Sequence, residues 1–183
     1  MNLDLTSSEK LANSIELLLI ESHAPEAFFS TLIPTLGEFL NCDRCFLYLR
    51  DPQTRLGKVP FCWRRNPAIP EIYNESWQLE PESLADEDPM FAAALRTEPS
   101  IFIKDVQTAN DRILNQQFEA ENFGHRALIH AHLYQDDQLW GVLQPCIFDR
   151  PRNWTQIERQ MMDQIVRSIV PIAIKYVNKF KPG

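Results

Sequence analysis

The sequence predicts an α/β (α+β) protein in which an antiparallel sheet lies between helical segments at the two ends of the chain. Apolar residues recur at helical spacing in residues 11–40 and 157–173. Between these segments, short apolar runs alternate with turn residues, which is typical of strands. With 183 residues, 44% hydrophobic and 23% charged, the chain has the size and composition of one globular domain. We therefore expect a single domain over residues 1–183.

Two helices are predicted within residues 1–40. Thr6 and Glu9 form a capping box for the first helix, whose apolar residues continue to about Ser22. The second helix follows closely and contains Pro34, which predicts a kink or a break because proline removes a helical hydrogen bond. Its apolar stripe consists of Phe28, Phe29, Leu32, Ile33, Leu36, Phe39 and Leu40.

The sheet and a pocket are predicted within residues 41–150. Residues 45–50 and 58–63 alternate as strands do, and a turn at residues 51–54 separates them. Residues 65–82 contain several prolines and are predicted to form a long irregular loop, of the kind that covers a cavity.

Two short helices with a strand between them are predicted next. Asp88 as N-cap with Pro89 at the first helical position marks the start of the first. Residues 101–106 form the strand. Thr108 or Asn110 is predicted to cap the second helix, whose apolar residues are Ile113, Leu114, Phe118 and Phe123.

The chain is predicted to end in a long helix over residues 154–180. Thr155 and Glu158 form a second capping box, and an apolar stripe follows them. Pro171 lies inside this stripe and should bend the helix.

Residues 127–134 and 138–148 are predicted to form a hairpin around Asp136-Asp137. The first strand carries His130 and His132, which lie two residues apart and therefore face the same side of the sheet. Two imidazoles on one face are the start of a metal or haem site. The alternative is that both histidines are hydrogen-bonded to the backbone, to helix ends or to Tyr134.

The register of this hairpin decides whether Cys146 joins the two histidines. With Asp136-Asp137 at the centre of the turn, His130 pairs with Leu143, and Cys146 pairs with Ala127. These pairs place His130 and Cys146 on opposite faces. A bulge near Pro145 would bring them to the same face.

Charge and hydropathy argue against two classes of partner. The formal net charge is −7, and residues 71–88 contain seven acids and no Lys or Arg. Such a surface repels phosphates, so we expect no nucleic-acid partner. The sequence has no apolar run of about 18 residues and no signal-peptide pattern at its start. We therefore expect no membrane insertion, a cytoplasmic location and reduced cysteines.

Four segments resemble a known family: residues 105–110 (DVQTAN), 123–127 (FGHRA), 138–143 (QLWGVL) and 151–154 (PRNW). They resemble GAF domains, and most of all the chromophore-binding GAF domains of phytochromes and cyanobacteriochromes. Residues 36–44 match this family less sharply. The resemblance implies a GAF fold with five to six antiparallel strands, in which the terminal helices pack on one face and a pocket with short helices lies on the other.

The resemblance also implies where a bilin would be held, and the chain departs from the family at each position. The family's attachment cysteine falls at Leu114 or Asn115, and neither side chain forms a thioether. Gln116 takes the place of the histidine or tyrosine that follows, and Cys146 takes the place of the pocket histidine. We therefore expect no covalent bilin at the usual position.

Candidate pocket residues come from the residue chemistry and from the resemblance. Aromatic side chains and an arginine after the second strand suit a planar or anionic ligand, and an arginine before the histidine strand suits a carboxylate. The candidates are Trp63, Arg64, Tyr73, Trp77, Asn115, Phe123, Arg126, Leu128, His130, His132 and Cys146.

Cys42 and Cys45 form a CxxC pair that is open to two interpretations. A redox pair normally lies at a helix N-terminus, where the dipole favours the thiolate. Here the pair follows a predicted helix and enters a strand, which favours a structural role. A thiol redox sensor remains the alternative.

The function expected from the sequence is regulatory. The chain has no GxSxG, HExxH or phosphate-loop motif and only five glycines, so we expect no enzyme activity. The expected function is that of a sensory GAF domain with an altered small-ligand pocket, which acts by homodimerisation through its terminal helices or by docking on a signalling protein. We expect no resident cofactor. The alternative is a sensor that binds haem, another tetrapyrrole or a metal non-covalently through His130, His132 and Cys146.

Overall fold

The computed structural model describes residues 11, 13–15, 17, 18 and 24–182. Its centre is a six-stranded sheet with the order β3-β2-β1-β6-β5-β4, in which every neighbouring pair is antiparallel. The strands are β1 (Arg44–Arg50), β2 (Leu56–Arg64), β3 (Asn74–Leu79), β4 (Ile101–Ile103), β5 (Ala127–Gln135) and β6 (Gln138–Ile147). The predicted α/β class with a central antiparallel sheet is confirmed.

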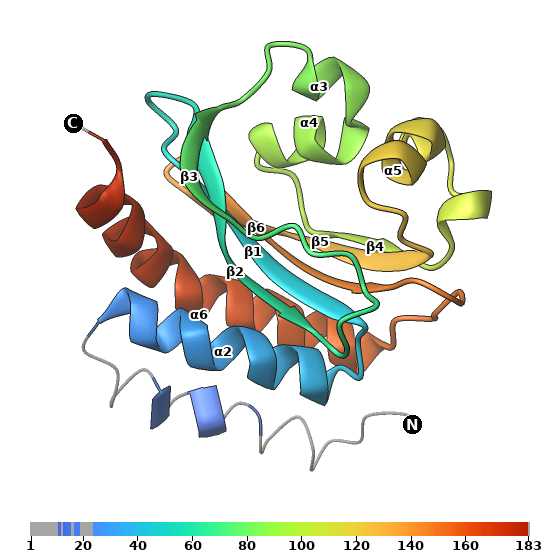
Figure 1. The fold of residues 1–183 in the computed structure, drawn as a ribbon, viewed down its shortest axis with the longest axis horizontal. Coiled ribbons are helices and arrows are strands. Elements are labelled where there is room, and N and C mark those ends of the chain that lie inside the picture. The colour runs from blue at the N-terminus through green and yellow to red at the C-terminus, as the bar shows by residue number, and fades with distance from the viewer. Residues whose placement is uncertain (1–10, 12, 16, 19–23, 183) are drawn as a thin grey trace.

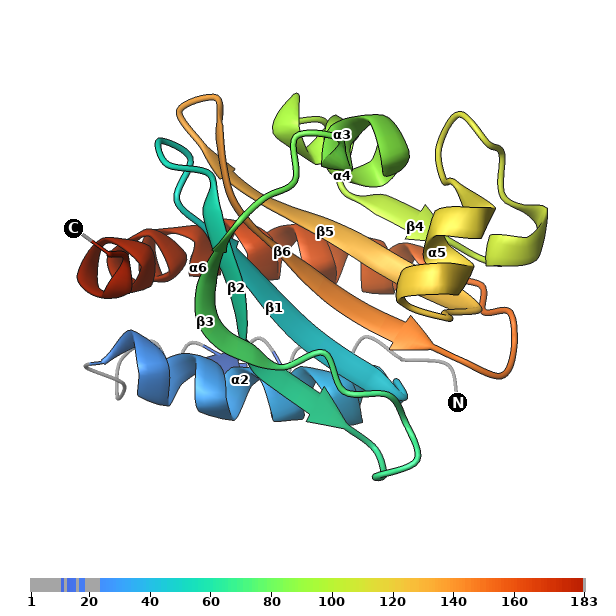
Figure 2. The ribbon, with the colours of Figure 1, turned by 45° about the horizontal axis from the view of Figure 1, so that its top comes forward.

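Helices cover the two faces of the sheet differently. The long helices α2 (Pro25–Phe39) and α6 (Gln156–Phe180) lie side by side on one face (Figure 1). Shorter helices lie on the other face (Figure 2), namely α3 (Leu84–Glu87), α4 (Pro89–Leu95) and α5 (Gln116–Asn122), with the 3-10 turn η1 (Val106–Thr108). Among the described residues, no helix combines the length and apolar character needed to cross a bilayer.

The main core lies between the sheet and the two long helices. Strand β1 sends Cys45, Leu47 and Leu49 into this core, because alternate residues of a strand face the same side. Strand β5 sends Ala127, Ile129, Ala131 and Leu133 to the same side. The residues between them, including Phe46, Tyr48 and His130, face the layer of short helices.

Both long helices contain a proline and continue through it. Helix α2 runs from Pro25 to Phe39 with Pro34 inside, so the predicted break is absent. The buried apolar stripe on both sides of Pro34 packs against the sheet and holds the helix together. Helix α6 starts with the predicted capping box and continues through Pro171, where the bend stays a prediction. The capping box predicted at Thr6 lies outside the described residues.

Three segments differ from the sequence prediction. The strand predicted over residues 101–106 ends at Ile103, because Asp105 is the N-cap of the 3-10 turn η1 and accepts the Gln107 N–H. Residues 65–82, predicted to form an irregular loop, contain strand β3. Its residues NESWQL show no apolar alternation, as expected for an edge strand with little burial. The second short helix begins later than predicted, at Gln116, because Asn115 is its N-cap and accepts the Phe118 N–H. Asn110 instead accepts the Arg112 N–H in the turn before it.

The hairpin forms around Asp136 and Asp137, with φ of 53° and 57°, but its predicted register is wrong. Leu133 pairs with Gly141 and Tyr134 pairs with Leu139, so Trp140 is an extra residue on β6. This bulge beside the turn lets Trp140 join the helix-side core while Leu139 and Val142 face the other side.

Because of this bulge, Cys146 pairs with Leu128 instead of Ala127, and His132 pairs with Val142. His130 and Cys146 therefore share one face of the sheet. The irregularity that the sequence analysis placed near Pro145 lies at Trp140 instead.

Three of the segments that carried the family resemblance hold β4 and the start of β5 in place. The Asp105 carboxylate pairs with Arg126, with Oδ1 2.7 Å from Nε, and also accepts the Gln107 N–H at the start of η1. Trp154, just before α6, donates from Nε1 to the carbonyl of Ile103 at 2.9 Å. These contacts position the loop that leads to α5.

Helix α2 approaches β2 closely at Gly37. A Cβ added at Gly37 would lie 2.1 Å from Cε3 of Trp63. We predict that Gly37→Ala lowers the free energy of unfolding by about 1–2 kcal/mol, since overpacking costs about 1–3 kcal/mol and the higher helix propensity of alanine returns up to about 1 kcal/mol. Urea denaturation measures the change.

The matched control for this substitution is Thr31→Ala, on the exposed side of the same helix. It should change stability by less than about 0.5 kcal/mol. Equal stability of Gly37→Ala and the wild type would contradict the predicted close contact.

Candidate functional site

A cavity of about 290 Å³ lies between the sheet and the layer of short helices. Residues of β1, β2, β3, β5 and β6 and of helices α4 and α5 line it, and we call it the sheet cavity. Its volume is close to the lower end of the usual range for small-ligand pockets, about 300–1,000 Å³.

One wall of the sheet cavity is aromatic. Phe46 of β1 and Phe123, which follows α5, have nearly parallel rings with an interplanar angle of 9° and centroids 6.5 Å apart. Phe118 of α5 meets Phe123 edge-on at 6.2 Å. Flat apolar surfaces of this kind favour a planar ligand, because stacking and burial of ring faces both stabilise it.

A buried polar network lies beside the aromatic wall. Arg44, fully buried on β1, donates from one terminal nitrogen to the Pro70 carbonyl and from the other to Nε2 of His125, both at 2.6 Å. His125 therefore accepts at Nε2 and donates from Nδ1–H to Oε2 of Glu119 at 3.0 Å. The rings of Phe46 and Phe148 flank the guanidinium. This Arg44–His125–Glu119 network fixes the tautomer of the histidine.

Glu119, on α5, is the member of this network that lines the sheet cavity. It is 1% exposed, and burial raises its pKa to about 7, although Arg44 acts in the opposite direction. Its second oxygen, Oε1, is buried and has no hydrogen-bond partner among the described residues. An unpaired buried polar atom costs about 1–3 kcal/mol, so Oε1 is an acceptor ready for a ligand donor.

His130 and His132 form a second hydrogen-bond network, in which each tautomer is fixed. His132 donates from Nδ1 to the carbonyl of Glu98 at 2.7 Å, which leaves its Nε2 as an acceptor. His130 donates from Nδ1 to that Nε2 at 2.9 Å. Burial lowers the pKa of both histidines, so both are neutral at pH 7. His130 lines the sheet cavity, and its Nε2 is an acceptor because its proton is on Nδ1.

The hydrogen bond between His130 and His132 argues against the predicted metal site. His130 and His132 share a proton between their facing nitrogens, whereas two ligands of one ion would both direct lone pairs at it. Cys146 lies in a separate apolar cluster with Leu128 and directs its Sγ to the Arg44 carbonyl at 3.4 Å. Among the residues that the structure describes, no group of three or more His, Cys, Asp or Glu side chains is placed to hold a metal ion.

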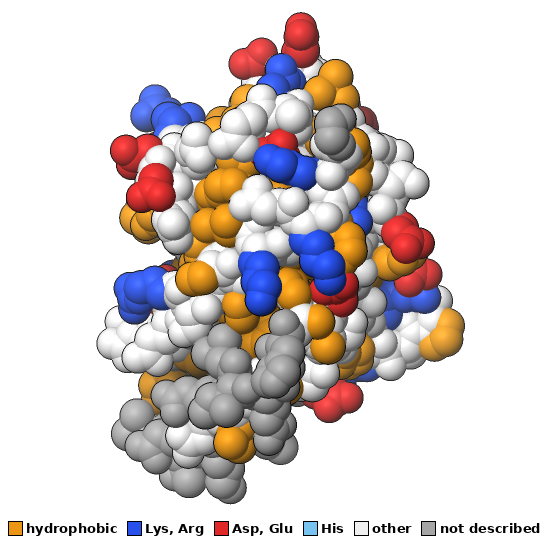
Figure 3. All heavy atoms as spheres, turned by 90° about the vertical axis from the view of Figure 1, so that its left-hand side faces the viewer, with side chains coloured by type: hydrophobic (Ala, Val, Ile, Leu, Met, Phe, Trp, Pro, Cys, Tyr) orange, Lys and Arg blue, Asp and Glu red, His pale blue; other side chains and the backbone are white. Residues whose placement is uncertain are grey.

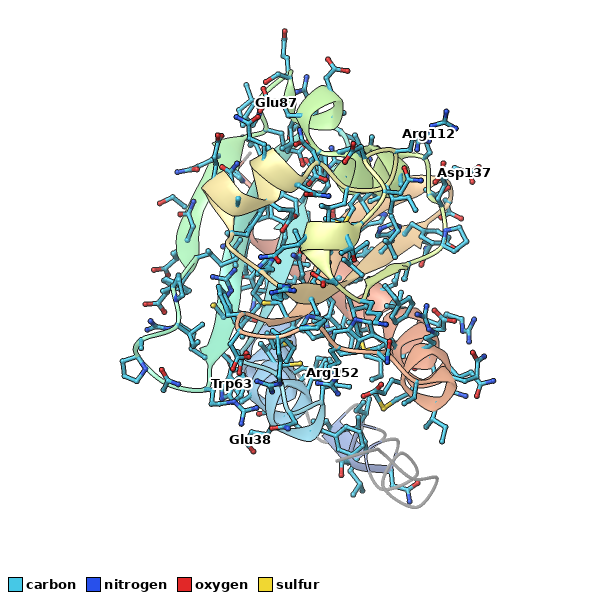
Figure 4. All side chains as sticks on the ribbon, turned by 90° about the vertical axis from the view of Figure 1, so that its right-hand side faces the viewer. Glu38, Trp63, Glu87, Arg112, Asp137 and Arg152 are labelled. Carbon is cyan, nitrogen blue, oxygen red and sulfur yellow. The ribbon has the colours of Figure 1, made fainter. Side chains whose placement is uncertain are left out.

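Two of the eleven predicted pocket residues, Phe123 and His130, line the sheet cavity. Trp63 instead packs on α2, on the side of the sheet away from α4 and α5 (Figure 4). Trp77 also belongs to the helix side, where its Nε1 donates to the Phe180 carbonyl at 2.7 Å. Successive residues of a strand face opposite sides of the sheet. Aromatic character alone therefore did not predict on which side Trp63 and Trp77 lie.

The remaining candidates have local partners. Arg64 bonds to the Ile69 carbonyl and to Glu71 of the following loop. Tyr73 is half-exposed. Asn115 caps α5 and donates from Nδ2 to the Glu87 carbonyl, which joins α5 to α3. Arg126 pairs with Asp105, and Leu128 is buried in the apolar cluster with Cys146.

Arg44, Glu119 and His125 were not among the site residues predicted from the sequence. One usable signal was present, because arginine is rarely buried and Arg44 begins an otherwise apolar strand, CFLYL. Glu119 gave no signal, since it lies in a polar helix whose other acidic residue, Glu121, is exposed. Its role depends on α5 lying over the sheet, which the sequence pattern does not reveal.

Cys42 and Cys45 are fully buried, and burial raises the pKa of both thiols. We predict that both react with iodoacetamide at least tenfold more slowly than half-buried Cys62, because thiolate is the reactive form and each pKa unit lowers its fraction about tenfold. Mass spectrometry of the native protein measures the order of modification, with the urea-unfolded chain as the control. Modification of Cys42 or Cys45 before Cys62 would revive the redox-sensor alternative.

The fold and the sheet cavity define a class of protein, in which an antiparallel sheet carries long helices on one face and a ligand-sized cavity under short helices on the other. The chain belongs to the GAF domain family, whose sequence profile matches residues 24–170. GAF domains are generally sensory or regulatory. A search of curated proteins found no match.

Solved structures of similar fold include bilin-binding GAF domains. The phycocyanobilin-bound GAF domain from a cyanobacterial phytochrome is 18% identical, with 100% of both chains covered and a TM-score of 0.73. The GAF domain of the cyanobacteriochrome receptor PixJ is 21% identical over 83% of this chain and 96% of that one, with a TM-score of 0.63. The GAF domain from Acinetobacter phosphoenolpyruvate-protein phosphotransferase is 11% identical over 98% and 97%, with a TM-score of 0.67. At these identities the likeness shows the fold alone.

Proposed function

We propose that this GAF domain is a non-enzymatic sensor that binds a small planar ligand in the sheet cavity and signals through its terminal helices. The observation that carries the proposal is the cavity itself, in which an aromatic wall stands beside the acceptor atoms of Glu119 and His130. Few convergent polar groups within an apolar pocket are typical of ligand sites.

The sheet offers a short path from the ligand to the helices. On β5, His130 faces the sheet cavity, while its neighbours Ile129 and Ala131 pack into the core beneath α6. A ligand that shifts β5 therefore changes the surface on which α6 rests, with a single layer of backbone between them. This arrangement supports output through homodimerisation or partner docking by α2 and α6.

A thermal-shift screen of planar fragments tests ligand binding. A ligand raises the unfolding temperature because it binds only the folded state. Val142→Phe, which places a larger ring on the cavity wall, should abolish the shift. Asn153→Ala, at a surface distant from the cavity lining, is the matched control and should retain it. Shifts that survive Val142→Phe would place binding elsewhere and count against the proposal.

Light scattering after size-exclusion chromatography tests the proposed homodimer. We expect a dimer at micromolar concentration, and a charge-reversal in the middle of the exposed face of α6, Arg167→Glu, should weaken it. A strict monomer would leave docking on another protein as the proposed output. Figure 3 shows Lys and Arg side chains separated by apolar and uncharged surface on the face drawn there, which supports a protein partner over a nucleic acid.

A non-covalently held tetrapyrrole is the second candidate ligand, because the similar GAF domain from a cyanobacterial phytochrome holds phycocyanobilin. Leu114 and Asn115 stand where the family has its attachment cysteine, and neither residue has a thiol. Leu114 is fully buried, and Asn115 caps α5. The absorption spectrum of the protein, purified with and without added biliverdin or haemin, tests this candidate. An absorption band that stays identical to that of the free pigment, for both pigments, would remove this candidate.

A further inference from the structure

We infer that the sheet cavity recognises a planar aromatic ligand with amidine-like N–H donors, through Oε1 of Glu119 and Nε2 of His130. This inference rests on the proposed function and names the ligand chemistry of the same cavity. The hydrogen-bond acceptors, the charge and the shape of the cavity each support it.

Both protein groups accept hydrogen bonds when Glu119 is ionised. Glu119 uses Oε2 for His125, so Oε1 is the oxygen without a partner among the described residues. His130 has its proton on Nδ1, because the His132 Nε2 that it faces has no proton to give. The carbonyl of Glu98 fixes this order, since a carbonyl only accepts. A ligand that meets these two atoms must donate to both.

Charge in the sheet cavity favours a cation over an anion. Asp88 and Glu119 line it, and Glu80 lines it as well but is paired with Arg50. Lys58 is the basic side chain among the lining residues. Its Nζ lies over the ring of Trp77 of β3 and over the rings of Tyr176 and Phe180 at the end of α6. Arg44 lies behind His125 and is occupied by that histidine and by the Pro70 carbonyl. The Nε–H of Arg44 has no hydrogen-bond partner among the described residues, but Arg44 is not one of the residues that line the sheet cavity. An anionic ligand would therefore find acids in the walls of the cavity.

The aromatic wall sets the shape of the ligand. The nearly parallel rings of Phe46 and Phe123, with Phe118 edge-on, suit the flat face of one aromatic ring. A cavity of about 290 Å³ matches a ligand of one or two rings. Together with the two acceptors, these features describe an aryl amidine or an amino-substituted nitrogen heterocycle.

Benzamidine and benzoate form the test pair, because they share size and planarity but only benzamidine donates hydrogen bonds. Titration calorimetry at about pH 8, where Glu119 is ionised, should show benzamidine binding with a Kd of about 10 mM or tighter, as expected for a fragment of this size. Benzoate should bind at least tenfold more weakly, since a hydrogen bond to a charged group is worth about 1.5–3 kcal/mol.

Two substitutions connect this preference to named atoms. In Glu119→Gln the amide oxygen is needed to accept from His125, so the NH₂ group replaces Oε1 and the acceptor becomes a donor. This variant should bind benzamidine at least tenfold more weakly and bind benzoate better than the wild type does. His130→Phe should weaken benzamidine several-fold. Glu121→Gln, on the exposed side of the same helix, is the matched control and should behave as wild type.

The outcomes separate this inference from the proposed function. A folded Glu119→Gln variant, shown by wild-type-like circular dichroism, that reverses the preference supports the inference. Benzamidine that fails to bind, benzoate that binds as well, or a preference unchanged by Glu119→Gln overturns it. A neutral or anionic fragment whose thermal shift is lost in Val142→Phe would still support the sensor while this ligand class failed.

Discussion

Glu80→Ala is expected to lower the free energy of unfolding by about 3–5 kcal/mol, because it leaves Arg50 as an unpaired buried charge. Arg50 of β1 and Glu80, which follows β3, form a two-pronged ion pair, with nitrogen to oxygen distances of 2.6 and 2.8 Å. Both side chains are 5% exposed. Tyr48 also donates to Glu80 at 2.6 Å, and burial raises the pKa of its hydroxyl, so the hydroxyl keeps its proton.

This pair reaches across β2, since β3, β2 and β1 are consecutive in the sheet. It fastens the edge strand β3 and the start of the short-helix layer to the centre of the sheet, and Glu80 also lines the sheet cavity. Loss of the pair should therefore loosen the cavity wall as well as lower stability. Urea denaturation monitored by tryptophan fluorescence measures the stability change.

The double substitution Arg50→Met/Glu80→Leu is the control for this prediction. Replacing both partners of a buried ion pair by apolar residues is often neutral, so this variant should be much more stable than Glu80→Ala. Some loss is expected, because Arg50 also donates to the Leu139 carbonyl at 3.1 Å. A double variant as unstable as Glu80→Ala would show that the charge left behind is not the cause.

The sequence predicted those parts of the fold that depend on local pattern. The Asp88-Pro89 helix start, the Thr155–Glu158 capping box and the Asp136-Asp137 turn are each decided within a few residues, and the structure contains all three. Strand β3 escaped prediction, because an edge strand is held by hydrogen bonds to β2 and needs no apolar alternation.

The candidate site was less predictable because it depends on which face each side chain takes. One extra residue, Trp140, shifts the hairpin register and moves Cys146 to the face of His130. Glu119 acquires its importance only when α5 lies over the sheet and meets His125 and Arg44. Neither event leaves a signal in residue type or spacing.

A second large effect is expected in the pH dependence of stability. Burial raises the folded-state pKa of Glu119 from 4.5 to about 7, so between these values the folded protein holds a proton that the unfolded chain has lost. Stability therefore falls as pH rises through this window. The groups around this carboxyl are Arg44 of β1, His125 before β5 and Asp88 before α4, while His130 and Glu80 line the same cavity.

Glu119→Gln should remove this dependence. The variant should match the wild type below about pH 4.5 and exceed it above pH 7 by up to about 3 kcal/mol, because one pKa unit corresponds to about 1.4 kcal/mol. The pKa of about 7 already includes the opposing effect of Arg44, which favours the ionised carboxylate. Burial also raises the pKa of Asp88, to about 6, and the charge of Glu119 adds to this shift, so the pKa of Asp88 should be lower in Glu119→Gln.

Urea denaturation at a series of pH values gives the difference between the two proteins directly. Glu121→Gln should follow the wild-type curve, because Glu121 is exposed. A constant difference between Glu119→Gln and the wild type from pH 4 to pH 8 would contradict a raised pKa, since a pH-independent change comes from packing alone. If the difference instead grows through this pH window and benzamidine reduces it, the ligand stabilises the ionised carboxylate of Glu119. Burial of that carboxylate makes the ligand-free protein less stable.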